Sequence, residues 1–372
     1  MTSLMKRVII EICKSIMSIC LYRPKAFLFL LKHKELFVHQ TYFPEEKYKL
    51  SSMRIFGEQI CNIIKYGGVN KFYFPYGFDV KSKSEKEKYV DYLAFMLRRD
   101  ELNIGAPSNH TCILRNKLLF NIVANGFGIK TAKNLLLVNR GEVTSIDPDF
   151  PASIGNLLKI GDAEYFCKLV DGECGLGIFV LVVRNGSFYV NDELIAESGL
   201  IELFVKGVYL IQEVVRQHDD MKALHPTSLN TLRLVTVKSL KDGVVHLLPS
   251  ILRIGTGDSI VDNTSRGGIA VGIDIERGVL KKYGFYKPEF GLKTTLHPDS
   301  KITFGGYKIP FFEEAKDMAL KFHSLINVHS VGWDVAITPD GPVFIEGNDN
   351  WEINGPQICN GGLKREFGNF FY

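Results

Sequence analysis

The sequence predicts an α+β protein, in which mainly antiparallel sheets carry helices packed against them. Three observations predict this class. Helical patterns fill residues 1–104, β-type runs separated by turns dominate residues 135–348, and hydrophobic residues make up 46% of the 372 residues against 23% charged ones. That balance is typical of globular proteins. A polypeptide of this length can form two or three domains, and no internal repeat or low-complexity linker interrupts it.

The first 35 residues form a separate basic feature. They contain seven lysines and arginines against two glutamates, a net charge of +5, so the other 337 residues sum to −1 and have no overall attraction for nucleic acid. Apolar residues from Ile9 to Cys20 follow the spacing of an amphipathic helix. Pro24 breaks this pattern, and neither apolar run in residues 1–35 can span a bilayer. Two interpretations stay open: a helix packed on its own domain, or a peripheral contact with anionic lipid.

Helices and strands are then expected in alternation. A capping-box candidate from Ser84 to Glu87 opens a helix toward Arg99, and a second helix begins near Asn116 and ends at Gly126. β-type runs at residues 135–138, 165–170 and 178–183 precede a short helix at 200–205. Strands are expected at residues 208–215, 231–239, 245–254 and 269–275, and a helix at 313–326 leads into a hairpin at 332–348.

A turn sequence, Pro339-Asp340-Gly341, separates the two strands of this hairpin. Pro339 suits the first central position of a type I turn, and Gly341 suits the left-handed residue that closes a three-residue loop. That loop pairs Thr338 with Pro342 and fixes the register of the whole hairpin. A two-residue loop would shift the register by one and turn the acidic residue of the first strand to the opposite face.

In the predicted register the hairpin carries three oxygen-bearing side chains on one face. Asp334 lies opposite Glu346, Gly332 lies opposite Asn348, and Glu346 and Asn348 are two residues apart. Two carboxylates this close repel each other unless a proton or a cation lies between them. Mg²⁺ prefers oxygen ligands and keeps coordination positions for water and phosphate. Asp334, Glu346 and Asn348 are therefore the candidate metal ligands.

A second candidate region is the glycine-rich turn after residue 170. Lys168 precedes Gly172, Gly175 and Gly177, and such glycines let backbone N–H groups approach phosphate oxygens while the lysine adds a positive charge. By itself the pattern also fits a flexible turn with a solvated lysine. The motifs GxxxxGK[ST] and, between a strand and a helix, GxGxxG are absent, so neither a P-loop NTPase nor a dinucleotide fold is predicted.

The cysteines and histidines indicate a reducing compartment and no zinc site. Seven cysteines are scattered without a CxxC pair, and no secretory signal is recognised, so we expect reduced thiols and a cytoplasmic location. The location would be the inner face of the membrane if the N-terminal helix contacts lipid. The nine histidines are equally dispersed.

Four segments carry a specific combination of motifs. They are LHPTSLNTLRLVTV (224–237), DNTSRGGIAVGID (262–274), HPDS (297–300) and GWDVAITPDGPVFIEGN (332–348). Together they closely resemble the sugar-transfer-associated ATP-grasp family, from about Pro107 to Asn354. The resemblance implies an ATP-grasp fold, with a small α+β subdomain at residues 105–212 and a large one at 213–372. Residues 1–104, an α-rich region, resemble the family only loosely, and their role stays open.

The resemblance also implies an ATP site. The two lysines that contact ATP phosphates in ATP-grasp enzymes correspond to Lys117 and Lys168, beside the glycine loop. The hinge that receives adenine corresponds to Gln212, Glu213, Val214 and Val215. No ribose-binding acid is evident after the hinge, and Asp219 and Asp220 are the candidates there.

Metal and transfer residues follow from the same resemblance. The family's metal ligands correspond to Asp334, Glu346 and Asn348, in agreement with the register argument. Arg233 corresponds to the arginine that stabilises a transferring phosphate. Arg253 and Arg266, with Asn263, match a pattern in the glutamate-ligase branch of the superfamily.

The implied reaction is an ATP- and Mg²⁺-dependent joining of a carboxylate to an amine through an acyl-phosphate. The substrates are expected to be a small-molecule acid and an amine, possibly sugar-linked, in cell-surface polysaccharide synthesis. Two alternatives stay open. A kinase-like ATP-grasp enzyme that phosphorylates a sugar would have the same phosphoryl-donor half, and a non-catalytic ATP-binding module would need only the nucleotide site.

Overall fold

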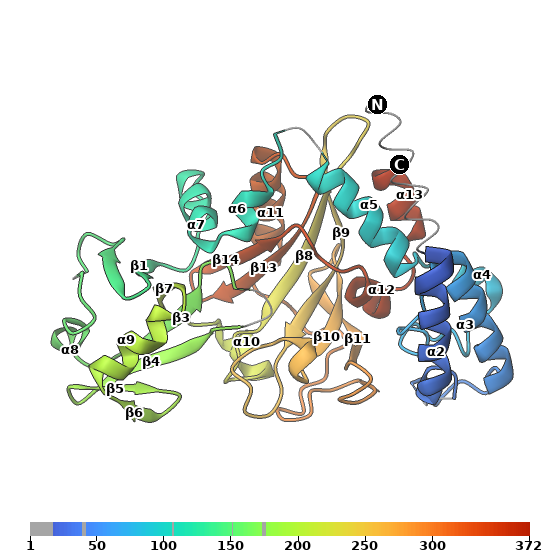
Figure 1. Ribbon diagram of the computed structural model, residues 1–372, viewed down its shortest axis with the longest axis horizontal. Helices are drawn as coiled ribbons and strands as arrows, with labels where there is room; N and C mark the ends of the chain where they lie inside the picture. The colour runs from blue at the N-terminus through green and yellow to red at the C-terminus, as the bar shows by residue number, and fades with distance from the viewer. Residues whose placement is uncertain (1–17, 39–41, 106–107, 151, 173–175) are drawn as a thin grey trace.

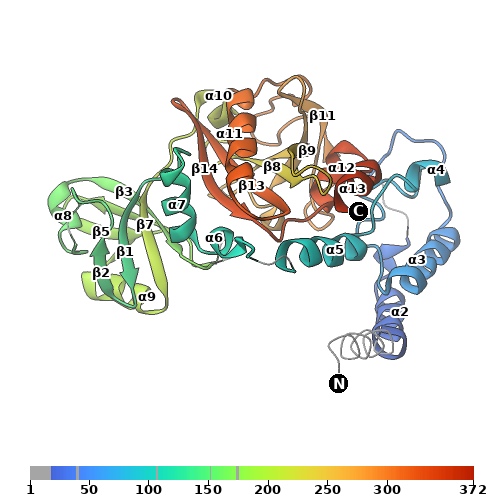
Figure 2. The same ribbon diagram turned by 90° about the horizontal axis from the view of Figure 1, so that it is seen from above.

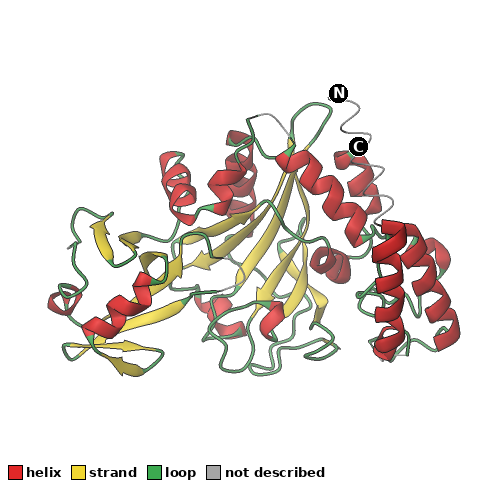
Figure 3. Ribbon diagram, viewed as in Figure 1, coloured by secondary structure: helices red, strands yellow, loops and turns green. Residues whose placement is uncertain are grey.

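The computed structural model describes residues 18–38, 42–105, 108–150, 152–172 and 176–372. Two seven-stranded antiparallel sheets form the body of the molecule, and an α-helical N-terminal region lies at the end remote from the first sheet (Figure 1). Strands fill the middle and the left of the molecule, while the right-hand end is helical (Figure 3). The α+β class and the antiparallel sheets predicted from the sequence are confirmed.

The N-terminal region consists of short helices. They are the π-helical turn η1 (Ser18–Tyr22), α2 (Arg23–Lys32), the 3₁₀ turn η2 (Lys34–Leu36), α3 (Ser52–Tyr66), α4 (Lys83–Lys86) and α5 (Tyr92–Ile104). Most of the predicted basic amphipathic helix falls in residues 1–17, outside the described residues. Pro24 lies in the first turn of α2, where its missing N–H is not needed.

The capping box was predicted two residues too late. Ser82 caps α4 by accepting from the Glu85 backbone N–H, and the Glu85 carboxylate accepts from the Ser82 backbone in return. The helix then stops, because the following stretch docks on the C-terminal part: the Lys88 carbonyl accepts from the Lys364 backbone N–H, and the Val90 N–H donates to the Gln357 side chain. Helix α5 begins separately.

The first sheet has the strand order β2-β1-β7-β3-β4-β5-β6. Its strands are β1 (Asn134–Asn139), β2 (Glu142–Ser145), β3 (Ala163–Leu169), β4 (Phe179–Arg184), β5 (Ser187–Val190), β6 (Glu193–Ile195) and β7 (Val208–Glu213). Helix α9 (Glu197–Val205) covers one face, where Leu200 and Phe204 join a core that includes Tyr165 and Cys167 of β3. Since side chains alternate along a strand, Glu164, Phe166 and Lys168 point to the other face.

The second sheet has the order β12-β11-β10-β9-β8-β13-β14. Its strands are β8 (Thr231–Lys238), β9 (Val245–Ile254), β10 (Ile269–Asp274), β11 (Val279–Phe285), β12 (Lys293–Thr294), β13 (Ser330–Thr338) and β14 (Gly341–Asn348). Helix α11 (Phe312–Leu325) packs on one face, against Leu232, Leu234 and Val335 among others. The alternate residues Arg233, Arg253 and Asp334 therefore face the other side, as predicted for Arg233.

The remaining helices connect these parts. They are α6 (Thr111–Arg115), α7 (Lys117–Gly126), α8 (Leu157–Ile160), α10 (Asp219–Leu224), the 3₁₀ turn η3 (Thr264–Arg266), α12 (Asn354–Asn360) and α13 (Lys364–Phe371). Seen from above, α5, α6 and α7 follow one another along one side, from the N-terminal region to the first sheet (Figure 2). The two sheets are joined by residues 214–230, which contain α10 and begin with a segment without regular structure, residues 214–218.

The hairpin has the predicted face but not the predicted loop. Thr338 pairs with Gly341 rather than with Pro342, so the loop has two residues. The register then shifts between Val335, which pairs with Phe344, and Asp334, which pairs with Glu346. The extra residue, Ile345, forms a bulge that restores the expected pairing. Asp334 therefore lies opposite Glu346, as predicted, for a reason that the turn sequence did not contain.

Candidate functional site

A cavity of about 1040 Å³ lies between the two sheets and extends to the N-terminal region. Strands β3, β4 and β7 form one wall, and the face of the second sheet opposite α11 forms another. The lining brings together most of the predicted site residues: Lys117, Lys168, Gly172, Gln212, Glu213, Val214, Val215, Arg233, Arg253, Asp334, Glu346 and Asn348.

Two lysines converge at the glycine turn. Lys117 is the first residue of α7, which Asn116 caps, and its ammonium donates to the Gly172 carbonyl. Lys168 comes from β3 and is only 3% exposed. Burial lowers the pKa of Lys168 to about 8; Glu346 opposes this shift and Lys117 adds to it. Two neighbouring cations, one of them buried, stabilise a bound polyanion. The part of the cavity beside Lys117 and Lys168 therefore suits the phosphates of a ligand.

The predicted hinge forms the adjoining wall. Strand β7 ends at Glu213, two residues earlier than expected, which leaves Val214 and Val215 in the segment between the sheets. Gln212 is buried, and its side-chain amide donates to Asn134 of β1 (2.5 Å). Glu213 is exposed and lies 3.7 Å from Lys133. Backbone groups of an irregular segment beside the apolar side chains of Val214 and Val215 suit a flat heteroaromatic ring.

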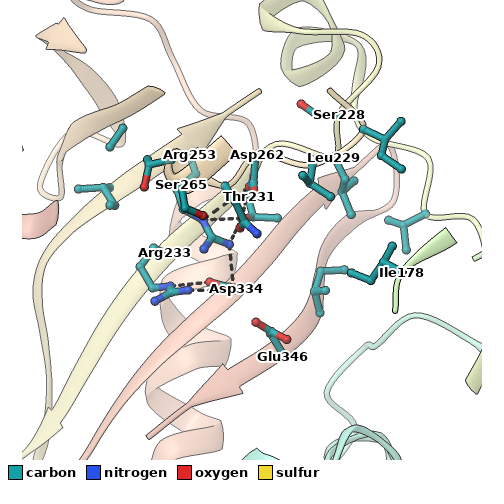
Figure 4. Close-up of a pocket in the computed structure, with 18 of the residues that line it drawn as sticks. Ile178, Ser228, Leu229, Thr231, Arg233, Arg253, Asp262, Ser265, Asp334 and Glu346 are labelled. Carbon is teal, nitrogen blue, oxygen red and sulfur yellow. Dashed lines mark hydrogen bonds and ion pairs between the residues drawn. The ribbon is translucent and has the colours of Figure 1, made fainter. Parts of the chain in front are cut away.

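Carboxylates and guanidiniums lie side by side on one face of the second sheet. One cross-strand row runs from Glu346 on β14 through Asp334 on β13 to Arg233 on β8. Arg233 donates through Nε to Asp334 Oδ1 (2.5 Å) and through Nη2 to Oδ2 (3.0 Å). Arg253 Nη2 lies 2.9 Å from the same Oδ2, so both guanidiniums converge on Asp334 (Figure 4). Burial would raise the pKa of Asp334, but the two arginines outweigh it and lower the pKa to about 2.

Arg253 is fixed by residues that the sequence did not single out. Thr231 Oγ1 accepts from Arg253 Nη2 (2.7 Å) and donates to Asp262 Oδ2 (2.5 Å). Asp262 also lies 3.6 Å from Arg253 Nε. Burial would lower the pKa of the guanidinium, but Asp262 and Asp334 raise it above its ordinary value. Thr231 and Asp262 both fall within the family motifs, close to Arg233 and Asn263. This position in the motifs is the sequence feature that could have identified them as site residues.

The metal-ligand set fits a magnesium ion at Glu346 and Asn348. Burial and the neighbouring Asp334 raise the pKa of Glu346. A bound cation would stabilise the ionised form of this carboxyl group. Asn348 Nδ2 lies 3.3 Å from Glu346 Oε1, and turning that amide over would present its oxygen instead. Both carboxylate oxygens of Asp334 contact arginines. Asp334 can therefore bind the metal ion only when an arginine moves away from one of these oxygens. Among the described residues no cluster of three His, Cys, Asp or Glu side chains could hold a metal; here the third donor is an amide.

A few predicted residues lie away from this centre. Arg266 is exposed at the end of η3 and does not line the cavity, and Gly175 lies outside the described residues. Gly177 has a positive φ of 69°, and a Cβ there would lie 2.6 Å from Leu169, so it serves the turn itself. Of the two ribose candidates, Asp219 lines the cavity and Asp220 does not.

The chain is similar to one known protein family and to several solved structures. The profile of the family described as "Sugar-transfer associated ATP-grasp" matches residues 102–369, whereas the curated proteins contain no match. Similar solved structures include an N5-carboxyaminoimidazole synthetase from Staphylococcus aureus complexed with ADP (9% identity, TM-score 0.40, covering 70% of this chain and 52% of that one). A second is an L-amino acid ligase from Bacillus licheniformis (12% identity, TM-score 0.37, covering 72% of this chain and 48% of that one). A third is a D-alanine-D-alanine ligase from Helicobacter pylori (11% identity, TM-score 0.38, covering 70% of this chain and 58% of that one).

The chain spans about half the length of these solved proteins, and the identities and TM-scores are too low to transfer an activity. The family match is different in kind, because it covers well over half of the chain and includes both lysines, the hinge, the arginines and the hairpin. The chain belongs to the sugar-transfer-associated ATP-grasp family.

Proposed function

We propose that the protein is an ATP-dependent carboxylate–amine ligase that works through an acyl-phosphate. The observation that carries this proposal is the row Glu346, Asp334 and Arg233, which faces the same cavity as Lys117 and Lys168. Cations and cation-binding carboxylates in one partly buried space are what the transfer of a phosphoryl group requires. Family membership supports ATP as the donor.

Each group then has a role in the chemistry. Lys117 and Lys168 hold the phosphates of ATP, and the hinge from Gln212 to Val215 receives the base. A substrate carboxylate oxygen attacks the γ-phosphorus and ADP leaves. Arg233 and Arg253 spread the negative charge that develops on the transferred group. The amine nitrogen next attacks the acyl carbon, phosphate leaves, and the nitrogen loses a proton, so an amide remains.

The magnesium ion would be held by Glu346 and Asn348, with Asp334 as the third ligand. When bound, it would neutralise negative charge on the phosphates of ATP. The protein's own contribution is to present these oxygens on one rigid hairpin face and to keep the space partly dry. Glu346 is half-buried and Asp334 is buried, which strengthens every charge interaction in the site.

The substrates that we propose are an acidic sugar or amino-acid component and an amine, in cell-surface polysaccharide synthesis. The description of the family supports the link to sugars. The decisive test is to incubate the protein with Mg-ATP and a panel of uronic acids and amines, followed by mass spectrometry. A ligase gives a product lighter than its two substrates together by one water. A phosphorylated sugar would instead establish the kinase, and ATP binding without any product would establish a non-catalytic module.

We also propose a peripheral contact with the cytoplasmic face of a membrane. Helix α2 exposes Leu28 (56%) and Leu31 (45%) beside Lys25 and Lys32, a combination of apolar and basic side chains that favours anionic lipid. Within the described ranges no helix has the length and apolarity to cross a bilayer. Such a contact would bring the enzyme to membrane-bound substrates.

A further inference from the structure

The cavity continues past the two arginines to an end with apolar walls. Ile251, Ala270, Phe285 and Ile358 line that end, together with Phe72 from the N-terminal region. Phe72 lies outside the residues that the family profile matches. The sequence did not point to it, since only the folded protein brings residue 72 to a space whose other residues lie beyond position 116.

Strand pairing fixes where these apolar side chains lie relative to the arginines. Ile251 pairs with Arg233 across β9 and β8. Ala270 pairs with Arg253 on one side and with Phe285 on the other. Directly paired residues project from the same face of a sheet at about 5 Å spacing. The apolar patch therefore begins one strand away from each guanidinium, on the side opposite to Glu346.

The wall formed by Phe72 is held firmly. Its neighbours Tyr73 and Phe74 belong to the same buried cluster as Ile251, Ala270 and Phe285. Tyr76 donates its hydroxyl to Asn354 Oδ1 (2.6 Å) and accepts from Gln357 Nε2 (3.1 Å), so this segment is bound to α12. The Phe72 ring itself stays half-buried. A fixed, half-buried aromatic ring on a cavity wall is available for contact with a ligand.

Polar groups also lie near Phe72. Glu352, which lines the cavity, accepts from the hydroxyl of Tyr92 (3.2 Å), and the Tyr92 ring neighbours that of Phe72 (centroids 6.4 Å apart). Lys287, two residues after Phe285, lines the cavity as well. A ligand at this end would meet an apolar wall on one face and hydrogen-bonding groups at its edge. A ring with one apolar face and polar substituents around its rim matches the apolar wall and the hydrogen-bonding groups. A flexible acyclic molecule would lose more conformational freedom on binding.

We propose that this end of the cavity is the subsite for the carboxylic acid substrate, that the acid is cyclic, and that Phe72 is a specificity-determining contact. The proposal rests on the ligase function argued above. The carboxylate lies at Arg233 and Arg253, and the ring extends over Ile251 and Ala270 to reach Phe72. The N-terminal region thus determines which acid the enzyme accepts.

The test measures binding, so it does not depend on turnover. Saturation-transfer NMR with Mg²⁺ and a non-hydrolysable ATP analogue would compare cyclic glucuronate with acyclic gluconate, on the full-length protein. We expect glucuronate to bind more tightly, and Phe72→Ala to weaken it about tenfold, the scale of one lost aromatic contact. Gluconate and nucleotide binding should not change. Tyr48→Ala, an exposed tyrosine of the same region outside the cavity lining, is the matched control.

Equal glucuronate binding by the wild type and Phe72→Ala would overturn the subsite, and failure of the wild type to prefer glucuronate over gluconate would overturn the cyclic class. If Phe72→Ala does not fold, Phe72→Leu, which keeps most of the apolar volume, must show the same selective loss. The two proposals fail separately. If glucuronate binds in a Phe72-dependent manner but no amide product forms, the proposed ligase function is wrong and the proposed subsite is supported.

Discussion

Asp334 and Glu346 are cross-strand partners, but their carboxyl groups meet different neighbours. Arg233 and Arg253 keep Asp334 ionised, while burial and Asp334 itself raise the pKa of Glu346. Glu346 is therefore the carboxylate that gains most from a bound cation. Asp334 also holds both guanidiniums in place, which in the proposed reaction would orient them toward the transferred group.

We expect Glu346→Gln to fold normally and to lose Mg²⁺-dependent turnover. Gln keeps the shape but removes the charge, and loss of one preorganised electrostatic contact costs at least about a hundredfold in turnover. A magnesium titration of turnover, with Mn²⁺ binding followed by EPR, measures both effects. Asp340→Asn, at the exposed tip of the same hairpin, is the control. Unchanged Mn²⁺ affinity in Glu346→Gln would remove Glu346 from the metal site.

We predict that Lys168 makes ATP binding depend on pH. Burial lowers its pKa to about 8 in the absence of phosphate, so the ammonium is charged at pH 7 and increasingly neutral above pH 8. At pH 7 we expect Lys168→Ala to bind ATP about tenfold or more weakly, the scale of a charge-assisted hydrogen bond. The gap between wild type and variant should narrow as the pH rises above the pKa of Lys168, because the wild type loses its charge. Calorimetric titrations at several pH values would show this; a gap that stays constant contradicts it.

At the scale of elements, the hairpin shows how far the sequence could be interpreted. Spacing placed Glu346 and Asn348 on one face, and that conclusion holds. The predicted three-residue loop was wrong, and the bulge at Ile345 restores the predicted pairing of Asp334 with Glu346. The turn residues could not predict this bulge, because packing on both faces of the sheet sets its position. Asp262 was not singled out, although it lies only nine residues after Arg253, because the fold of the loop after β9 and not a local pattern brings it to the guanidinium.

Helix α2 carries the membrane proposal. Its Leu30 is fully buried and Arg23 donates to the Ile64 carbonyl of α3 (3.1 Å), so deleting residues 1–35 would also disturb packing. The paired substitution Leu28→Glu and Leu31→Glu changes only exposed positions. We expect it to reduce co-sedimentation with anionic vesicles at least severalfold while soluble activity stays unchanged. Met53→Glu, on α3 and 85% exposed, should bind like the wild type. Equal binding by all three proteins would restore the packed-helix interpretation.

At the scale of the molecule, the two sheets, joined by residues 214–230, enclose a cavity whose lining changes along its length. Lys168 of the first sheet and Lys117 of α7 lie at one end, and carboxylates and guanidiniums of the second sheet follow. Apolar residues of β9, β10 and β11 and Phe72 from the N-terminal region form the other end. Local patterns predicted most strands and the antiparallel class. They did not predict that residues 18–104 would close the far end of the cavity, because the contacts of Tyr42 with residues 286 and 291 span more than 240 positions.

The central claim is that the enzyme forms an acyl-phosphate, and hydroxylamine trapping tests it most directly. With Mg-ATP, the correct acid and hydroxylamine in place of the amine, we expect a hydroxamate to accumulate. Arg233→Lys, which loses the bidentate fork, should keep ATP binding within about a factor of a few and lower hydroxamate formation by about a hundredfold or more. A stable phosphorylated sugar, with no hydroxamate from any acid in the panel, would contradict the claim.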